Sequence, residues 1–249
     1  MPTATGVLLD PAEFDPAGFD PAGPGAADGA RRPSPPRADG TPHLWLLRAT
    51  QHRAFALASA PDVLVAEERT RAAALRVPAD RECYLATHVA LRLLLGAYLD
   101  LSPREVPLMR IPCPCCGGPH GRPSVAGHPL HYSISHSGSL GLLAFAATPV
   151  GVDTETVPPA RAVREASDAL HPQELAELAL LPEPARPTAF SRAWVRKEAY
   201  LKGLGIGLAD DPAARYVGTG IEPAVPGPGW RLADVAVVRG FSAAVAWQH

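Results

Sequence analysis

The spacing of apolar residues predicts three helical regions in the first three quarters of the chain. Apolar positions recur at helical spacing over 81–99, where Asp80 can cap the helix, and a shorter helix is expected over 66–76. A further helical region is expected over 161–186. For Arg92 on the long helix, a solvated surface position is the simplest interpretation.

Shorter apolar runs, several of them alternating with polar residues, predict strands. They cover 43–48, 131–137, 140–147, 150–155, 230–238 and 241–247. Arg239 and Gly240 lie between the last two runs and predict a hairpin turn. Strands therefore alternate with helices along much of the chain.

The helix expected over 190–202 carries most of the candidate chemistry. It contains no Gly or Pro, and three glycines follow it at alternate positions, where one can adopt a left-handed C-cap. Trp194, Glu198 and Lys202 stand four residues apart and share one face. Lys197 and Lys202 are the two lysines of a chain with 23 Lys and Arg residues, so each is a candidate for work that arginine cannot do. An ordinary amphipathic helix is the alternative.

The first 40 residues differ in composition from the rest of the chain. They are rich in Pro, Ala, Gly and Asp, and Asp-Pro-Ala occurs three times. Few side chains in this segment can bury apolar surface, so we expect a mobile extension over 1–40. Order is expected to begin near His43.

Composition narrows the functional classes. A net charge of −2 gives no general attraction to nucleic acid or to an anionic membrane. The apolar runs are too short to span a bilayer, and the first residues do not form a signal-peptide pattern. Four cysteines, three of them within four residues, do not resemble a secreted disulfide framework. We therefore expect a cytoplasmic protein that binds neither nucleic acid nor membrane.

A loop rich in Pro, Gly and Cys lies between 110 and 123. Cys113 and Cys116 have the C-x-x-C spacing of a zinc knuckle, and Cys115 and His120 offer two more ligands. Structural zinc usually draws on two separated pairs, however, and adjacent cysteines strain tetrahedral chelation. A rigid loop with partly buried thiols is the simpler alternative. The arginines at both ends of the loop, with His120, would suit a phosphate.

Two predicted strands end in polar residues. Ser135, His136 and Ser137 contain a Ser–His pair, but the G-x-S-x-G elbow of a hydrolase is absent, and the group also suits a phosphate. Asp153 and Glu155 are two residues apart on a strand and point to the same face. Adjacent carboxylates repel unless a cation joins them, and an oxygen-only set favours Mg²⁺ or Mn²⁺. A solvated strand end is the alternative.

The order of the motifs resembles that of a known family. The motifs are Gly121-Arg-Pro123, Ser133-Ile-Ser-His-Ser137, Gly151-Val-Asp-Thr-Glu155 and Trp194-Val-Arg-Lys-Glu-Ala-Tyr-Leu-Lys202. This succession resembles the 4′-phosphopantetheinyl transferases, and more specifically the surfactin-synthetase-activating type, over about residues 81–208. The resemblance implies an α+β fold of two pseudo-symmetric α/β halves, 41–149 and 150–249, behind the 1–40 extension.

The resemblance also implies an activity. Members of the family transfer the phosphopantetheine arm of coenzyme A to a serine of an acyl or peptidyl carrier protein and release adenosine 3′,5′-bisphosphate. Asp153, Glu155 and Glu198 are implied to hold Mg²⁺, or Mn²⁺, at the coenzyme A pyrophosphate. Glu198, directly or through a water on the metal, would take the proton from the carrier serine. Lys202 would contact the phosphate that is transferred.

Further contacts to coenzyme A are implied in the first half. The expected residues are Arg81, Arg110, Arg122, Pro123, Ser135 and His136. Ser135 and His136 would bind one phosphate, and Arg122 stands where the family usually has lysine. Arg81 and Arg110 would reach the 3′-phosphate or the adenine edge. Glu174, near the start of a helix that Pro172 can open, falls where the family often has a further glutamate, and its role stays open.

The implied arrangement is a monomer with coenzyme A between the two halves, serving polyketide or nonribosomal peptide synthases. A carrier protein is expected to dock beside the 203–207 loop, on Leu204, Ile206 and Leu208. The chain departs from the family pattern at the polar Thr154, in the cysteine-rich loop and in the extension.

Two other classes of protein remain as alternatives. A metal-dependent nuclease would use Asp153 and Glu155, but it would want a lysine where Val157 stands. A zinc-loop interaction module without catalytic activity is the second alternative.

Overall fold

The computed structural model describes residues 8–19, 33–207 and 211–249. The helices are α1 Ala49–Val63, α2 Ala66–Ala74, α3 Pro78–Leu99, α4 Ala160–Ala166, α5 Pro172–Leu180 and α6 Arg186–Leu204. The strands are β1 Ala12–Glu13, β2 His43–Arg48, β3 Leu108–Arg110, β4 Pro123–Val125, β5 His131–Ser137, β6 Leu140–Ala146, β7 Val150–Thr156, β8 Trp230–Asp234 and β9 Phe241–Gln248.

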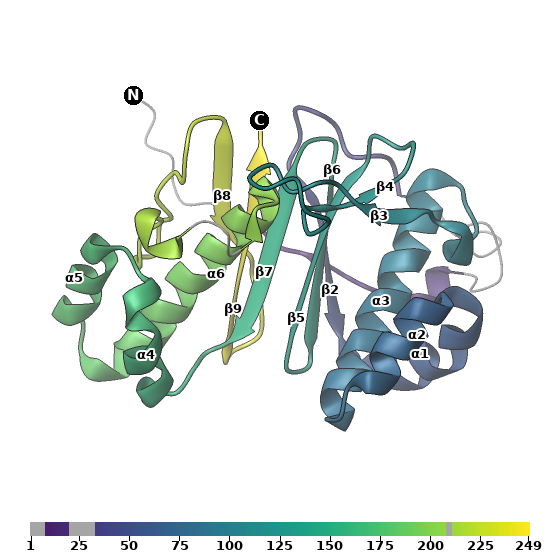
Figure 1. Ribbon diagram of the computed structural model, residues 1–249. Coiled ribbons are helices and arrows are strands. Elements are labelled where there is room, and N and C mark those ends of the chain that lie inside the picture. Colours follow the sequence, from purple (N-terminus) through teal and green to yellow (C-terminus); the bar gives the residue numbers. More distant parts are fainter. Residues whose placement is uncertain (1–7, 20–32, 208–210) are drawn as a thin grey trace.

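Two sheets form the centre of the molecule, with α1–α3 on one flank and α4–α6 on the other (Figure 1). The first sheet has the strand order β1-β2-β6-β5-β4-β3, and the second has the order β7-β9-β8. All neighbours are antiparallel except β1 and β2. The α+β fold expected from the sequence is confirmed.

Strand β6 shows why these residues form this core. Leu143 and Phe145 face the cluster under α1–α3, whereas Leu142 and Ala144 face the apolar cluster between the two sheets. A strand buried on both faces needs apolar residues at every position, which explains the uninterrupted apolar run of β6. Another apolar cluster, which includes Ala199 of α6 and Ala244 of β9, packs α6 against the second sheet.

The N-terminal segment corrects one prediction. Residues 8–19 of the expected mobile extension pack against both sheets, so the prediction is wrong for them. The backbone of Leu9 bonds to Asp234 and Ala236 beside β8, β1 pairs with β2, and Phe14 is only 3% exposed. Open sheet edges and a few apolar side chains are enough to order this stretch, despite its Pro and Gly content. Residues 1–7 and 20–32 of the extension lie outside the described residues.

Several predicted boundaries shift. Helix α3 begins at Pro78, with Val77 as its N-cap, so Asp80 lies in the first turn and does not cap the helix. Strand β8 ends at Asp234, before the predicted end at position 238. Gly205 provides the expected left-handed C-cap of α6.

Within the described ranges, no helix combines the length and apolar character that crossing a bilayer requires.

Arg92 is a second correction. It is buried, and its Nε donates to Glu68 Oε2 at 2.6 Å, while its Nη1 donates to the carbonyl of Pro103 at 3.0 Å. The guanidinium therefore joins α3 to α2 and to the turn after α3. Its burial is possible because several acceptors satisfy its donors.

A row of serines joins β5 to β7, which belong to different sheets. The Oγ atoms of Ser133, Ser135 and Ser137 accept hydrogen bonds from the backbone N–H groups of β7 residues 152, 154 and 156, at 3.0, 3.3 and 3.3 Å. Because side chains alternate along a strand, all three hydroxyls point the same way. We call this row the serine seam. It satisfies N–H groups at the edge of the second sheet and fixes β7 beside β5.

Replacing Ser133 with alanine should lower the free energy of unfolding by about 1–3 kcal/mol, because the buried N–H of Val152 would lose its acceptor. Urea denaturation measures the effect. Ser167, whose hydroxyl donates to a carbonyl on an exposed helix end, is the control, and its alanine variant should match the parent chain. Equal stability of both variants would show that the Ser133 hydrogen bond does not stabilise the fold.

Candidate active site

Helix α6 lies unusually close to β7, and two glycines permit this. A Cβ atom at Gly151 would lie 2.1 Å from the carbonyl oxygen of Ala199 and 2.3 Å from the N of Gly203. Any other residue at position 151 would push the helix away from the strand. The close crossing places Glu198 and Lys202 of α6 directly beside the carboxylates of β7.

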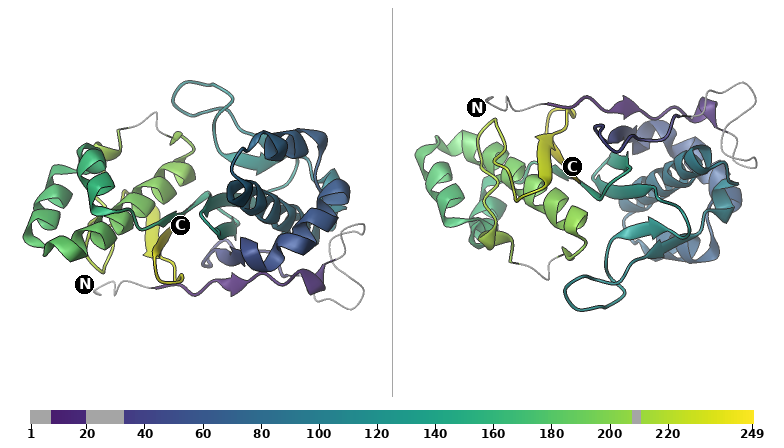
Figure 2. Two further views of the ribbon diagram at one scale, coloured as in Figure 1. Left: turned by 90° about the horizontal axis from the view of Figure 1, so that it is seen from below. Right: turned by 90° about the horizontal axis from the view of Figure 1, so that it is seen from above.

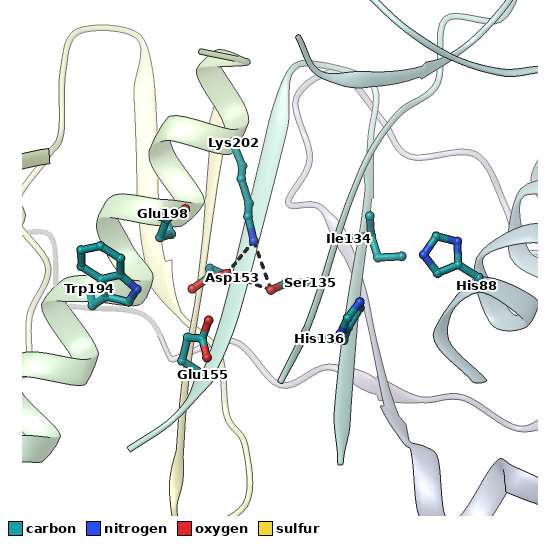
Figure 3. A pocket seen from close by; sticks show the side chains of 9 residues that line it. All are labelled: His88, Ile134, Ser135, His136, Asp153, Glu155, Trp194, Glu198 and Lys202. Atoms are coloured by element: carbon teal, nitrogen blue, oxygen red, sulfur yellow. Dashed lines mark hydrogen bonds and ion pairs between the residues drawn. The ribbon is translucent and has the colours of Figure 1, made fainter. Parts of the chain in front are cut away.

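The facing side chains line a cavity of about 390 Å³ between the two flanks of the molecule (Figure 3). The lining residues are His88, Ile134, Ser135, His136, Asp153, Glu155, Trp194, Glu198 and Lys202. They come from α3, β5, β7 and α6. The structure thus brings together the predicted carboxylates, Lys202 and the predicted Ser135–His136 pair.

Asp153 is the centre of the hydrogen bonding in this cavity. Its Oδ1 accepts from Lys202 Nζ at 2.6 Å and from Ser135 Oγ at 2.8 Å, and Lys202 Nζ also lies 3.1 Å from Ser135 Oγ (Figure 3). Its Oδ2 is buried without a hydrogen-bond partner among the described residues. A buried carboxylate oxygen without a partner is costly, which suggests that a ligand completes its coordination.

Burial and mutual repulsion act on the two glutamates. Burial raises the pKa of Glu198, Asp153 and Glu155 raise it further, and Lys202 opposes them. Burial also raises the pKa of Glu155, the hydroxyl of Ser137 opposes this at 2.7 Å, and Asp153 adds to it. Both directions mean that an additional positive charge in the cavity would be favourable.

His136 lies at the exposed rim of the cavity. Partial burial of the imidazole lowers the pKa of His136, and the charges of His88 and Lys202 lower it further. The imidazole is therefore neutral at pH 7, so it can offer one N–H donor to a phosphate.

The carboxylates suit a hard divalent cation. Asp153, Glu155 and Glu198 line the cavity and offer only oxygen ligands, and Asp153 Oδ2 has no hydrogen-bond partner among the described residues. The carboxylate oxygens of these three residues are not all within 4.8 Å of one another, as the atoms that hold one metal ion would be. Among the described residues, Cys113, Cys116 and His120 do meet that limit. Repulsion between carboxylates explains this wider spacing, and a cation would draw the side chains together. The donor set fits Mg²⁺.

Comparison with known proteins connects this cavity with a family. Residues 149–219, which include β7 and α6, match the 4′-phosphopantetheinyl transferase superfamily. The chain is 30% identical over 208 residues to the 4′-phosphopantetheinyl transferase HetI of Nostoc sp., an alignment that covers 82% of this chain and 86% of HetI. The chain belongs to the 4′-phosphopantetheinyl transferase superfamily.

A second relative in the superfamily aligns over a shorter stretch. The chain is 29% identical over 152 residues to slr0495 of Synechocystis sp., which is provisionally named a 4′-phosphopantetheinyl transferase. This alignment covers 59% of each protein. The chain therefore matches somewhat more than half of the length of slr0495.

The arginines expected at the coenzyme A site of a phosphopantetheinyl transferase do not line the cavity. Arg81 donates to the carbonyl of Leu75 at 2.7 and 3.2 Å, and Arg110 donates to that of Gly121 at 2.9 Å. Arg122, which precedes Pro123 at the start of β4, donates to the carbonyl of Gly203 at 2.7 Å, and burial lowers its pKa. Each guanidinium has five N–H groups, so donors remain for other partners.

The position of Ile206 corrects the carrier-docking surface that was predicted from the sequence. Ile206 is only 7% exposed, because the chain turns back onto the protein after the C-cap of α6, so its side chain is not available to a partner. Leu204 is half-buried, and Leu208 lies outside the described residues. The three-residue apolar patch predicted from the sequence is therefore not present as expected.

Glu174 has a structural role in the fold. It is fully buried, accepts the N–H groups of His171, Val217 and Gly218, and forms an ion pair with Lys197 at 2.8 Å. Lys197 also donates to the carbonyls of Pro212 and Arg215. Neither Glu174 nor Lys197 lines the cavity. The bonds of Lys197 instead hold the segment after α6 against that helix.

His88 is a cavity residue that sequence reasoning missed. It stacks on Tyr84, with ring centroids 3.9 Å apart, and its Nδ1 is 3.7 Å from Glu68 Oε1, longer than a hydrogen bond. A histidine inside the apolar repeat of α3 was the available signal, since an imidazole among core residues needs a polar partner.

Proposed function

We propose that this chain transfers the 4′-phosphopantetheine group of coenzyme A to a serine of an acyl or peptidyl carrier protein, with adenosine 3′,5′-bisphosphate as the second product. The observation that carries the proposal is the juxtaposition of Asp153, Glu155 and Glu198 with Lys202 in one cavity. Attack of a hydroxyl on a pyrophosphate needs a base for the proton and positive charge for the phosphoryl oxygens, and this cavity offers both.

Glu198 is proposed to accept the proton of the carrier serine. Its pKa is raised above that of an exposed glutamate, toward neutral pH. A carboxylate with a higher pKa is a stronger base once it is deprotonated. The proton would move from the serine Oγ to the Glu198 carboxylate while the Oγ forms its bond to phosphorus. The bond from that phosphorus to the bridging oxygen breaks, and the leaving adenosine bisphosphate retains the oxygen.

Lys202 is proposed to stabilise charge on the transferred phosphate. Its ammonium bonds to Asp153 and Ser135, and the Lys202 side chain as a whole is 32% exposed and lines the cavity. Asp153, Glu155 and Glu198 would hold Mg²⁺, or Mn²⁺, which would neutralise charge on the pyrophosphate oxygens when bound. A fixed ammonium costs little reorganisation as charge develops in the transition state.

The first half is proposed to bind the rest of coenzyme A. His136 and Ser135 would contact one phosphate at the rim of the cavity. Arg122, next to Pro123, would contribute through donors that its bond to Gly203 leaves over, and Arg81 and Arg110 would bind the 3′-phosphate or adenine. The Asp80 carboxylate acts electrostatically on His136, which supports a place for the N-terminal end of α3 near this rim.

The finer family assignment also belongs to this proposal. We propose the surfactin-synthetase-activating type, with a coenzyme A-binding half over 41–149 and a metal-binding half over 150–249. Each part has a long helix on an antiparallel sheet, α3 on β5 and β6 and α6 on β7 and β9, which supports a pseudo-symmetric relation. We further propose a cytoplasmic monomer that serves polyketide or nonribosomal peptide synthases.

Intact-protein mass spectrometry tests the activity. An apo carrier protein incubated with this chain, coenzyme A and Mg²⁺ should gain the mass of one phosphopantetheine group. A carrier with its acceptor serine replaced by alanine is the control and should not change mass. No mass gain on fatty acid, polyketide and peptide carriers, together with no binding of coenzyme A, would overturn the proposed function.

A further inference from the structure

The loop between β3 and β4 lies outside the catalytic cavity, and it projects from the body of the molecule (Figure 2). Its two ends are held together by a hydrogen bond from Ile111 N to the carbonyl of Arg122 at 3.0 Å. From this base, the Arg122 guanidinium donates to the carbonyl of Gly203 at the C-terminal end of α6. The loop is thus connected with the helix that carries Glu198 and Lys202.

Three side chains of this loop converge. The ligand atoms of Cys113, Cys116 and His120 all lie within 4.8 Å of one another, and Cys116 Sγ is 3.0 Å from His120 Nε2. Within the described ranges, no other group of three His, Cys, Asp or Glu residues meets this limit. Zinc with Zn–S bonds of about 2.3 Å and Zn–N bonds of about 2.0 Å separates neighbouring ligand atoms by about 3.5–3.8 Å. Small side-chain rotations would therefore make this geometry.

The backbone holds the first cysteine in a suitable turn. Gly117 N donates to the carbonyl of Cys113 at 2.8 Å, Cys113 N donates to that of Gly118 at 2.7 Å, and Gly117 has the positive φ of 70° that the turn requires. The backbone N–H groups of Cys115 and Cys116 hydrogen-bond to the Cys113 sulfur. Such bonds stabilise the thiolate, which is the form that binds metals.

Cys116 and His120 can approach each other because the residue between them in space, Gly118, has no Cβ. A Cβ atom at Gly118 would lie 3.0 Å from His120 Cδ2 and 3.3 Å from Cys116 Sγ. Glycine at this position leaves the room in which the thiol and the imidazole approach each other. Cys115 and Cys116 are both exposed, but the sulfur of Cys115 is not among the ligand atoms that lie within 4.8 Å of one another.

We propose that Cys113, Cys116 and His120 bind one Zn²⁺, with solvent as the fourth ligand. Two thiolates and an imidazole are soft and borderline ligands, which favour zinc over the hard Mg²⁺ of the catalytic cavity. The metal fixes the loop whose base holds Arg122 against the end of α6. Its role is structural, because the cluster does not line the cavity.

Metal analysis of three variants tests this site. The chain is produced with added Zn²⁺ and purified in excess Mg²⁺, so that the catalytic carboxylates do not retain zinc. The parent chain should hold one zinc per chain. Cys116→Ser and His120→Ala should reduce the zinc content at least about tenfold, because each removes a ligand. Cys115→Ser is the matched control and should keep the metal.

Cobalt substitution reports the ligands directly. Co²⁺ in the parent chain and in Cys115→Ser should show tetrahedral visible bands and a thiolate charge-transfer band. Cys116→Ser should lose part of the charge-transfer band. Removal of zinc by a chelator should increase amide hydrogen exchange in residues 111–122 and leave α3 unchanged.

Several results would overturn the proposal. They are a parent chain without zinc, a Cys115→Ser variant that loses as much zinc as Cys116→Ser, and a parent chain lighter by two hydrogens, which would indicate a disulfide. Unchanged exchange in the loop after zinc removal would overturn the structural role. None of these results depends on transferase activity.

Discussion

Replacing Glu198 with glutamine should lower kcat for phosphopantetheine transfer by about 10²–10⁴-fold, the usual contribution of a general base. The amide keeps the size of the side chain but cannot accept the serine proton, and it is a weaker ligand for Mg²⁺. The thermal midpoint should stay equal or rise, because burial and the charges of Asp153 and Glu155 disfavour the Glu198 carboxylate. Single-turnover transfer to an apo carrier protein, followed by mass spectrometry, measures the rate.

Glu165→Gln is the matched control for this result. Glu165 is an exposed glutamate in an i,i+4 pair with Arg161 and does not line the cavity, so its amide variant should transfer at the parent rate. A rate for Glu198→Gln within about threefold of the parent rate would show that another group takes the proton. A large fall in the thermal midpoint would instead assign Glu198 to the support of the fold.

Replacing Lys197 with methionine should lower the free energy of unfolding by about 3–5 kcal/mol, the usual cost of leaving one partner of a buried ion pair alone. The Lys197 and Glu174 side chains are 1% and 0% exposed. The substitution would also remove the donor for the carbonyls of Pro212 and Arg215. Denaturation in urea measures the loss, and kcat at a temperature where the variant remains folded should change little.

Arg161→Met is a suitable control, because Arg161 lies 2.8 Å from Glu165, the same separation as in the buried pair. The Arg161 and Glu165 side chains are both largely exposed, so the free energy of unfolding should fall by less than about 1 kcal/mol. The double variant Glu174→Gln with Lys197→Met should recover part of the stability, since it removes the isolated charge. Equal losses for the exposed and the buried pair would contradict the role assigned to Lys197.

The carboxylates and Lys202 could be predicted from the sequence because their positions follow simple periodicity. Asp153 and Glu155 are two apart on a strand, and Glu198 and Lys202 are four apart on a helix, so each pair shares a face. The cavity then needs only one crossing of strand and helix. The family motifs pointed to the same four residues.

The two lysines show where that reasoning fails. The scarcity of lysine marked both as functional candidates, but only Lys202 lines the cavity. The Lys197 ammonium is buried, where it contacts one carboxylate and two carbonyl groups. The partners Glu174, Pro212 and Arg215 come from distant parts of the chain, and local periodicity does not reveal which of them meet.

The N-terminal segment and the serine seam could not be predicted for a similar reason. Composition describes what a segment can bury by itself, but residues 9–14 are ordered by open edges of sheets that form elsewhere. The serines of β5 suggested a phosphate cradle, and the structure shows that their hydroxyls also accept N–H groups of β7. Side-chain bonds between two sheets leave no periodic signal beyond alternation.

The placement of the two lysines also makes amine chemistry a specific probe of this protein. Lys197 is sealed inside the fold, whereas the Lys202 side chain is 32% exposed. Apart from the amino terminus, an acylating or reductively methylating reagent therefore has one accessible target, and that target lies in the cavity. Protection of Lys202 from labelling would report occupancy of the site without any assay of turnover. Immobilisation through the Lys202 amine would, for the same reason, block the cavity, so biosensor experiments require a tag instead.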